Sequence, residues 1–270
     1  MSKKFSFFIV ISLASLFFLF SVTTRAARSA ELTRFLSTQE IVNKLSTRSS
    51  SNGVARAPAS LSLSVANNDV DLRAYDSPVV SQFGGTCSTF ATAAVMENVM
   101  RSNGVQKLVS HRDLWSDYGV YDADAAVQAA TDNYITELQY WTDDGTQAPD
   151  YQDHRSMKIT RSVGHDYDYQ AGIQALDQHH PVVMAIQVPS DLDNCSPTID
   201  PNSKRTKGNH VMAAVGYHID SSVAGGGYFI LKNSWGPDCG DHGYHYYPFA
   251  LCQRSDLYCY FIEVDSVEAK

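Results

Sequence analysis

The sequence lacks several features that would assign it to large classes of protein. No cluster of lysine and arginine resembles the basic footprint of a nucleic-acid-binding domain, and the net charge of −8 disfavours polyanionic partners. No internal repeat is present, and after the N-terminal segment no apolar run is long enough to cross a bilayer. We therefore expect no nucleic-acid partner. The 270 residues suffice for one domain, or for two packed lobes with a sizeable core, and we expect a monomer.

The N-terminus predicts export. Residues 1–26 have the organisation of a secretory signal peptide: two lysines near the start, an apolar run over residues 5–20, and small residues at the cleavage positions Thr24 and Ala26. The alternative is an uncleaved membrane anchor, for which the apolar run is short. We expect a secreted protein that reaches the extracellular space, or the periplasm or lumen on its way, and that has no membrane contact once the signal is removed.

The next segment has the pattern of a removable precursor part. Residues 31–45 carry apolar side chains at helical spacing, interrupted near Ser37, and residues 47–63 are rich in serine, alanine, asparagine and glycine, as in a flexible linker. We predict that residues 27–65 form a short pro-segment that could inhibit the rest of the chain. The alternative is a packed N-terminal element that is never removed.

The predicted secondary structure changes from helical to β-rich along residues 66–270. Residues 66–155 are mainly helical by period, whereas residues 156–270 are dominated by short β-rich runs bounded by glycine, proline, asparagine or aspartate. We therefore predict an α+β fold: a helical lobe and a strongly curved, barrel-like antiparallel lobe, with a cleft between them. The predicted helices cover residues 88–101, 110–115, 122–141 and 168–179, and the predicted strands cover residues 157–163, 181–188, 210–219, 227–232, 243–247 and 258–264.

Cys87 is the first candidate for chemistry. It follows Gly84-Gly85, which permit a sharp turn, and precedes an alanine-rich helical run, so it should lie at a helix N-terminus. There the unpaired N–H groups and the helix dipole favour a thiolate, which makes Cys87 a candidate nucleophile. Gln82 stands five positions upstream and could offer an N–H to an oxyanion beside the sulfur. The alternative is that Cys87 is half of a disulfide.

Cysteine is otherwise scarce. The sequence has five, and an odd number leaves one thiol unpaired. Four cysteines permit three pairings, of which we favour Cys195 with Cys239 and Cys252 with Cys259; free buried thiols are the alternative. Cys239 with His242 and His245 has no recognised zinc spacing, so we expect no metal.

Partners for a thiolate occur in the second half. A nucleophilic thiol needs an imidazole, and that imidazole needs a third group to hold its orientation. Asn209-His210 opens a predicted strand, with Asn209 as a supporting residue. Asn233 could accept from one ring nitrogen of His210, and Trp235 could cover that hydrogen bond from water.

These residues together resemble the papain-like cysteine peptidase family, over essentially everything from Val70 onward. The resemblance implies that Cys87 is the nucleophile and His210 its ion-pair partner. It implies further that Asn233 orients His210, that Trp235 shields the bond, and that Gln82 and the Cys87 N–H form an oxyanion hole. The implied reaction is hydrolysis of protein or peptide substrates through a thioester acyl-enzyme, by an endopeptidase without metal or organic cofactor. The motifs are Gln82…Gly85-Thr86-Cys87-Ser88-Thr89-Phe90-Ala91, Asn209-His210-Val211, Lys232-Asn233-Ser234-Trp235-Gly236 and Gly243-Tyr244.

Two other functions fit the same residues. A transpeptidase or amide-transfer enzyme would use the same acyl-enzyme with a different second nucleophile. A non-catalytic binding protein could keep the fold alone. That alternative is favoured by Ser88, where the family has an aromatic residue, and by Gln82, which is one residue closer to the cysteine than in the family.

Overall fold

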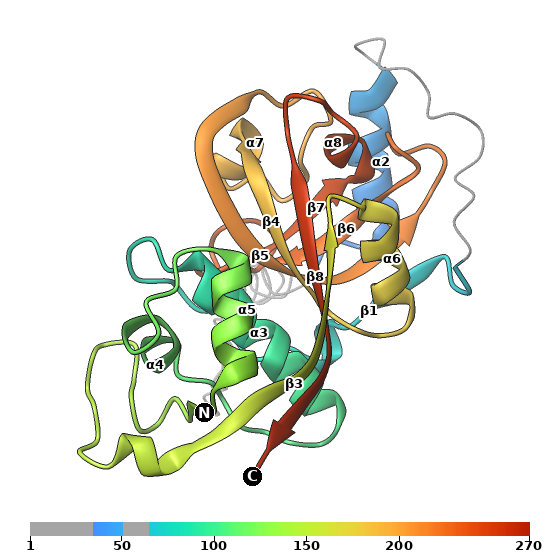
Figure 1. Cartoon of the computed structure of the whole chain (residues 1–270). Coiled ribbons are helices and arrows are strands. Elements are labelled where there is room, and N and C mark those ends of the chain that lie inside the picture. Colours follow the sequence, from blue (N-terminus) through green and yellow to red (C-terminus); the bar gives the residue numbers. More distant parts are fainter. Residues whose placement is uncertain (1–34, 51–64) are drawn as a thin grey trace, which may run out of the picture. The chain divides into compact units, whose positions relative to one another are not determined.

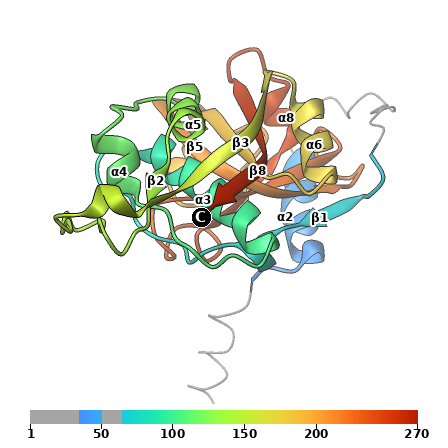
Figure 2. The same ribbon diagram turned by 60° about the horizontal axis from the view of Figure 1, so that its bottom comes forward.

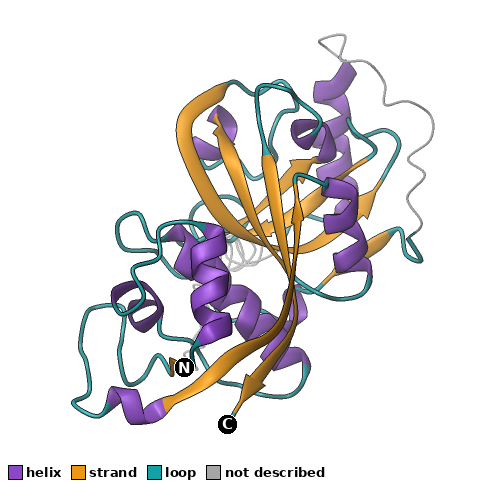
Figure 3. Cartoon of the chain, viewed as in Figure 1, coloured by secondary structure: helices purple, strands orange, loops and turns teal. Residues whose placement is uncertain are grey.

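The structure, a computed structural model, describes residues 35–50 and 65–270; the predicted signal peptide and most of the predicted linker lie outside these ranges. Residues 37–270 form one compact unit. Helices α3, α4 and α5 gather at one end of it, whereas β4–β7 and the helices α6, α7 and α8 gather at the other (Figures 1 and 3). The mixed α+β class with an antiparallel sheet is confirmed. The helices are α2 (Thr38–Ser50), α3 (Cys87–Ser102), α4 (His111–Ser116), α5 (Ala123–Asp132), α6 (Tyr169–Asp177), α7 (Ser190–Asp193) and α8 (Phe249–Cys252), with 3-10 turns η1 (Arg73–Tyr75) and η2 (Tyr151–His154).

The sheet follows the order β2-β3-β8-β4-β5-β6-β7, and β1 pairs with β5 outside this path. Each of these neighbouring pairs is antiparallel. β3 and β8 form a long ribbon that runs from the strand-rich end toward the helical end (Figure 2). The strands are β1 (Asp69–Asp71), β2 (Ile135–Thr136), β3 (Arg155–Asp166), β4 (Val182–Pro189), β5 (Arg205–Ile219), β6 (Gly227–Lys232), β7 (Tyr244–Pro248) and β8 (Cys259–Ala269).

Helix α3 is the central helix of the helical end, and it packs against β5 and β8. Its side chains are buried almost all round, among them Phe90, Val95 and Met96. A helix that is buried on all sides needs small residues, and the alanines and threonines of this run supply them. The helix ends at Asn103, ahead of Gly104 at φ +82°, as the sequence predicts.

The predicted helix over residues 122–141 is wrong beyond Asp132. Asp122 caps α5 by accepting the Ala125 N–H at 2.7 Å, and the helix stops at Asn133, whose backbone is extended. The helical spacing of apolar residues continues further, but Ile135 and Thr136 pair with β3 instead. Aromatic and β-branched residues favour this extended pairing, and the sheet contact outweighs the local period.

The strand that carries His210 is also longer than predicted. β5 begins at Arg205, so His210 lies within the strand and not at its start. Residues 205–209 are polar and mostly exposed, and such a segment has no apolar alternation that would reveal a strand. The backbone of Asn209 pairs with Gln187 of β4, and His210 pairs with Ile186.

Helix α2 begins with a capping box. The Ser37 N–H donates to the Glu40 carboxylate at 2.8 Å, and the Glu40 N–H donates to the Ser37 hydroxyl at 3.3 Å. This explains the predicted interruption near Ser37, because the helix starts only after it. Ile41, Val42 and Leu45 are buried, so α2 is packed against the rest of its unit. Within the described residues, no helix is both long and apolar enough to span a membrane.

Candidate active site

Cys87 is the first residue of α3 and carries a free thiol, so the alternative of a disulfide at this position is wrong. Its sulfur is half-buried, and the backbone N–H groups that lower its pKa belong to Cys87 and Ser88 at the start of the helix and to Val211 on β5. The contact with Val211 brings the thiol to the strand position that follows His210. The N-terminus of α3 and strand β5 therefore lie close together at this sulfur.

His210 is held by the partners that the sequence predicts. Its ring is 3% exposed, and Nε2–H donates to Asn233 Oδ1 at 2.7 Å. The Trp235 ring lies over the imidazole, with 4.4 Å between centroids and 30° between planes. Asn233 follows the last residue of β6, and its backbone N–H donates to the Gly243 carbonyl. Asn209, in contrast, is exposed, and its supporting role stays a prediction.

Gln82 approaches the site through Ser234. The Gln82 N–H donates to the Ser234 carbonyl at 2.7 Å, and the Ser234 hydroxyl donates to Gln82 Oε1 at 2.7 Å. Gln82 Nε2 donates to the Gly84 carbonyl, also at 2.7 Å. An amide nitrogen carries two hydrogens, so this contact engages one of them. The tight turn at Gly84 and Gly85 therefore fixes the side chain that the sequence assigns to an oxyanion hole.

Burial disfavours charge on either Cys87 or His210 alone. It raises the pKa of the Cys87 thiol, against the lowering effect of the Val211, Ser88 and Cys87 N–H groups. It also lowers the pKa of His210 to about 4, although the hydrogen bond to Asn233 favours the protonated ring. A charged site therefore requires transfer of the thiol proton to the imidazole, so that thiolate and imidazolium form together and attract each other.

The other four cysteines form the pairs that we favoured, Cys195–Cys239 and Cys252–Cys259. Cys239 lies near a histidine, with 3.9 Å between its sulfur and His245 Nε2. This sulfur is bonded to Cys195, so it is neither a nucleophile nor a thiolate ligand. Cys87 is left as the thiol that can react.

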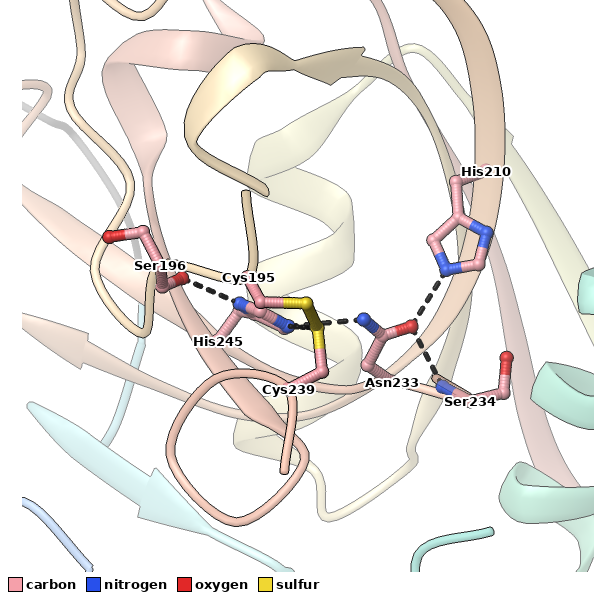
Figure 4. Close-up of a disulfide and its surroundings, with 7 residues drawn as sticks. All are labelled: Cys195, Ser196, His210, Asn233, Ser234, Cys239 and His245. Atoms are coloured by element: carbon pink, nitrogen blue, oxygen red, sulfur yellow. Dashed lines mark hydrogen bonds between the residues drawn. A yellow bond between two sulfur atoms is a disulfide. The ribbon is translucent and has the colours of Figure 1, made fainter. Parts of the chain in front are cut away.

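His245 is a part of the site that the sequence analysis did not identify. It lies on β7, is fully buried, and its Nε2 is 3.1 Å from Asn233 Nδ2 (Figure 4). In the sequence it is one of nine histidines, and it directly follows the Gly243-Tyr244 motif without being part of it. Its position twelve residues after Asn233, on the strand that pairs with β6, is the signal that could have found it.

A cavity of about 80 Å³ lies between α3, β5 and β6. It is lined from the helical end by Phe90 and His111, and from the sheet by Val211 and Asn233. Neither Cys87 nor His210 is among its lining residues. The predicted cleft at the thiol stays a prediction.

Comparison with known proteins identifies the family of the chain. The sequence profile of the family described as papain family cysteine protease matches residues 66–254. Cathepsin B-like CP3 of Giardia intestinalis is 36% identical over 88 residues, which cover 32% of this chain and 29% of that protein. Pro-cathepsin H of Bos taurus is 31% identical over 106 residues, which cover 35% of this chain and 29% of the relative. The chain thus matches under a third of the length of these curated relatives.

Solved structures show the same fold. Xylellain, a cysteine protease from Xylella fastidiosa, superposes with a TM-score of 0.60 over 77% of this chain and 89% of its own, at 17% identity. Digestive procathepsin L 3 of Tenebrio molitor superposes with a TM-score of 0.59 over 76% of this chain and 73% of its own, at 23% identity. At these identities the likeness concerns the fold. The profile match over most of the chain, together with this fold, establishes that the protein belongs to the papain family of cysteine proteases.

Proposed function

We propose that this protein is an exported cysteine endopeptidase in which Cys87 is the nucleophile, His210 its base and Asn233 the group that orients His210. One observation carries the proposal: a free thiol at the N-terminus of α3 lies close enough to the backbone N–H of Val211, the residue after His210, for that group to lower its pKa, while Asn233 accepts a hydrogen bond from the His210 ring. With Nε2–H bound to Asn233, the imidazole has Nδ1 as its acceptor for the thiol proton.

The reaction then follows from the positions of these groups. The thiol proton passes to His210 Nδ1, and the sulfur attacks the carbonyl carbon of the substrate peptide. The resulting oxyanion accepts hydrogen bonds from Gln82 Nε2 and the Cys87 N–H. The C–N bond breaks, the amine product takes the proton from the imidazolium, and a thioester on Cys87 remains. Water gives a proton to His210 and attacks the thioester, which releases the carboxylic acid and restores the thiol.

Hydrolysis of peptides tests this proposal. The N-terminally processed protein should cleave members of an internally quenched peptide library, and Cys87→Ala should abolish that cleavage while the protein remains folded. Added amines should leave the products as free acids. An inactive wild type with an intact fold would contradict the proposal, and amide products would assign the chain to group transfer.

We propose further that residues 1–26 direct export and that residues 27–65 are removed on maturation. Support comes from the two disulfides, which suit an oxidising compartment, and from the likeness to a procathepsin. The burial of Ile41 and Leu45 favours the alternative in which α2 stays attached. Mass spectrometry of the secreted active form distinguishes the two: a start between Ser60 and Val70 supports removal, and a start near Ala27 contradicts it.

A further inference from the structure

His245 lies outside the predicted set of Cys87, His210 and Asn233, and it is buried on the side of Asn233 away from His210 (Figure 4). His245 Nδ1 is 2.8 Å from the Ser196 carbonyl oxygen, and Nε2 is 3.1 Å from Asn233 Nδ2. Its ring is fully shielded from water. A buried imidazole with both nitrogens engaged has a defined tautomer, which its partners determine.

The partners fix that tautomer without ambiguity. A carbonyl oxygen only accepts, so His245 Nδ1 carries the proton and donates it to Ser196. Nε2 is then a bare acceptor, and the Asn233 amide can satisfy it only with its NH2 group. Burial also lowers the pKa of His245 to about 4, which keeps the ring neutral near pH 7.

The orientation of Asn233 follows. With Nδ2 turned to His245, Oδ1 faces the opposite side, where it accepts His210 Nε2–H and the Ser234 N–H, each at 2.7 Å. Turning the amide over would set NH2 against two donors and Oδ1 against the lone pair of His245. All three hydrogen bonds would be lost together.

We infer that His245 is a positioning residue: it orients the Asn233 amide and, through it, holds His210 with Nδ1 available to the thiol. This rests on the proposed function of Cys87, His210 and Asn233. His245 touches neither the thiol nor the reacting peptide in this scheme, so its effect is carried entirely by Asn233.

The Cys195–Cys239 disulfide links the two segments that lie beside the His245 imidazole. Ser196, whose carbonyl accepts the hydrogen bond from His245 Nδ1, follows Cys195. Cys195 is bonded to Cys239 of the loop between β6 and β7. The Gly240 N–H donates to the Cys195 carbonyl at 3.2 Å. A Cβ on Gly240 would lie 2.8 Å from His245 Cε1, so a side chain at position 240 would collide with the ring. The disulfide thus places the carbonyl that selects the tautomer.

A double-mutant cycle on the N-terminally processed protein tests the inference. His245→Met removes the acceptor, and His245→Gln, of nearly equal size, supplies an amide oxygen in its place. We expect His245→Met to lower kcat about 10- to 100-fold with little change in KM, as outer partners of functional histidines do in metal sites. His245→Gln should recover a large part of that loss. Tyr247 is buried on the same strand, and its hydroxyl has no hydrogen-bond partner within the described residues. As a control, Tyr247→Phe should therefore leave kcat unchanged.

The decisive comparison uses Asn233→Ala as the background. If His245 acts through Asn233, His245→Met should change kcat less than about 2-fold once Asn233 is replaced. An equal loss in both backgrounds would overturn the inference. Turnover by the wild type and by Cys87→Ala is measured first. A wild type that is inactive contradicts the proposed function. An active wild type in which the effects of His245→Met and Asn233→Ala on kcat simply multiply contradicts only the role of His245.

A second measurement needs no substitution at His245. Histidine ¹⁵N NMR on the wild-type protein with Cys87 blocked by a thiol reagent reports which nitrogen carries the proton. We expect His245 with its proton on Nδ1 near pH 7. A proton on Nε2, or a charged ring at that pH, would overturn the inference even where His245→Met fails to fold.

Discussion

The two disulfides offer a comparison in which stability and catalysis should separate. Replacing Cys195 and Cys239 by serine opens a link of sequence separation 44, and replacing Cys252 and Cys259 opens one of separation 7. The chain-entropy relation predicts a loss in the free energy of unfolding of about 4 kcal/mol for the first and about 2.4 kcal/mol for the second. Each pair of serines avoids leaving a free thiol that competes with Cys87.

Catalysis should respond to only one of these changes. Cys195 adjoins the Ser196 carbonyl that accepts from His245, and the Cys239 sulfur is 3.9 Å from His245 Nε2. A looser loop there should let the Asn233 amide reorient, which lowers kcat by about 5- to 10-fold in a folded protein. The Cys252–Cys259 link joins α8 to the start of β8 and has no such contact, so its loss should leave kcat within about 2-fold.

Urea unfolding gives the stability of each variant, and steady-state hydrolysis below the unfolding transition gives kcat. Cys252→Ser/Cys259→Ser is the matched control for general loosening. Equal losses of kcat in both double variants would refute the argument that the Cys195–Cys239 link acts on the reaction, and so would an unchanged kcat in Cys195→Ser/Cys239→Ser.

Three further predictions concern the site. His210→Ala should lower kcat/KM by about 10³-fold or more, because the thiol loses its proton acceptor; steady-state kinetics check this, and a loss of less than about 10-fold would contradict it. Gln82→Ala should lower kcat by about 10²-fold with little change in KM, since Gln82 acts on the oxyanion, and a change confined to KM would count against that role. Burial lowers the pKa of both His210 and His245 from 6.5 to about 4, so the unfolded state binds more protons than the folded state between these pH values. This is tested in Cys87→Ala, where no thiolate pairs with His210. There the free energy of unfolding should fall as the pH drops from about 6.5 to about 4, by up to about 3 kcal/mol per histidine. Urea titrations that show no such fall would contradict the prediction.

Much of the site could be predicted because its parts leave local signals. The turn at Gly84-Gly85 and the alanine-rich run after it place Cys87 at a helix N-terminus without any tertiary knowledge. His210 and Asn233 each sit in a short run of distinctive residues. The favoured disulfide pairing was also confirmed, although the sequence alone permits two others.

What could not be predicted depends on contacts between distant segments. The role of His245 exists only because β7 pairs with β6 and because a linked loop brings the Ser196 carbonyl to its ring. The end of α5 at Asn133 is set by the pairing of Ile135 with β3, against a helical period that continues along the sequence. Polar residues 205–209 give no sign of the strand that they begin. In each case the structure is determined by strand pairing in the sheet, which the local sequence pattern does not reveal.

The central claim is that Cys87 is the nucleophile. The most direct measurement is peptide mapping by mass spectrometry after treatment of the native protein with an epoxide thiol inhibitor. The account predicts one adduct on Cys87, absent in Cys87→Ala and strongly slowed in His210→Ala. No adduct on a folded wild-type protein, or an adduct on a residue other than Cys87, would contradict it.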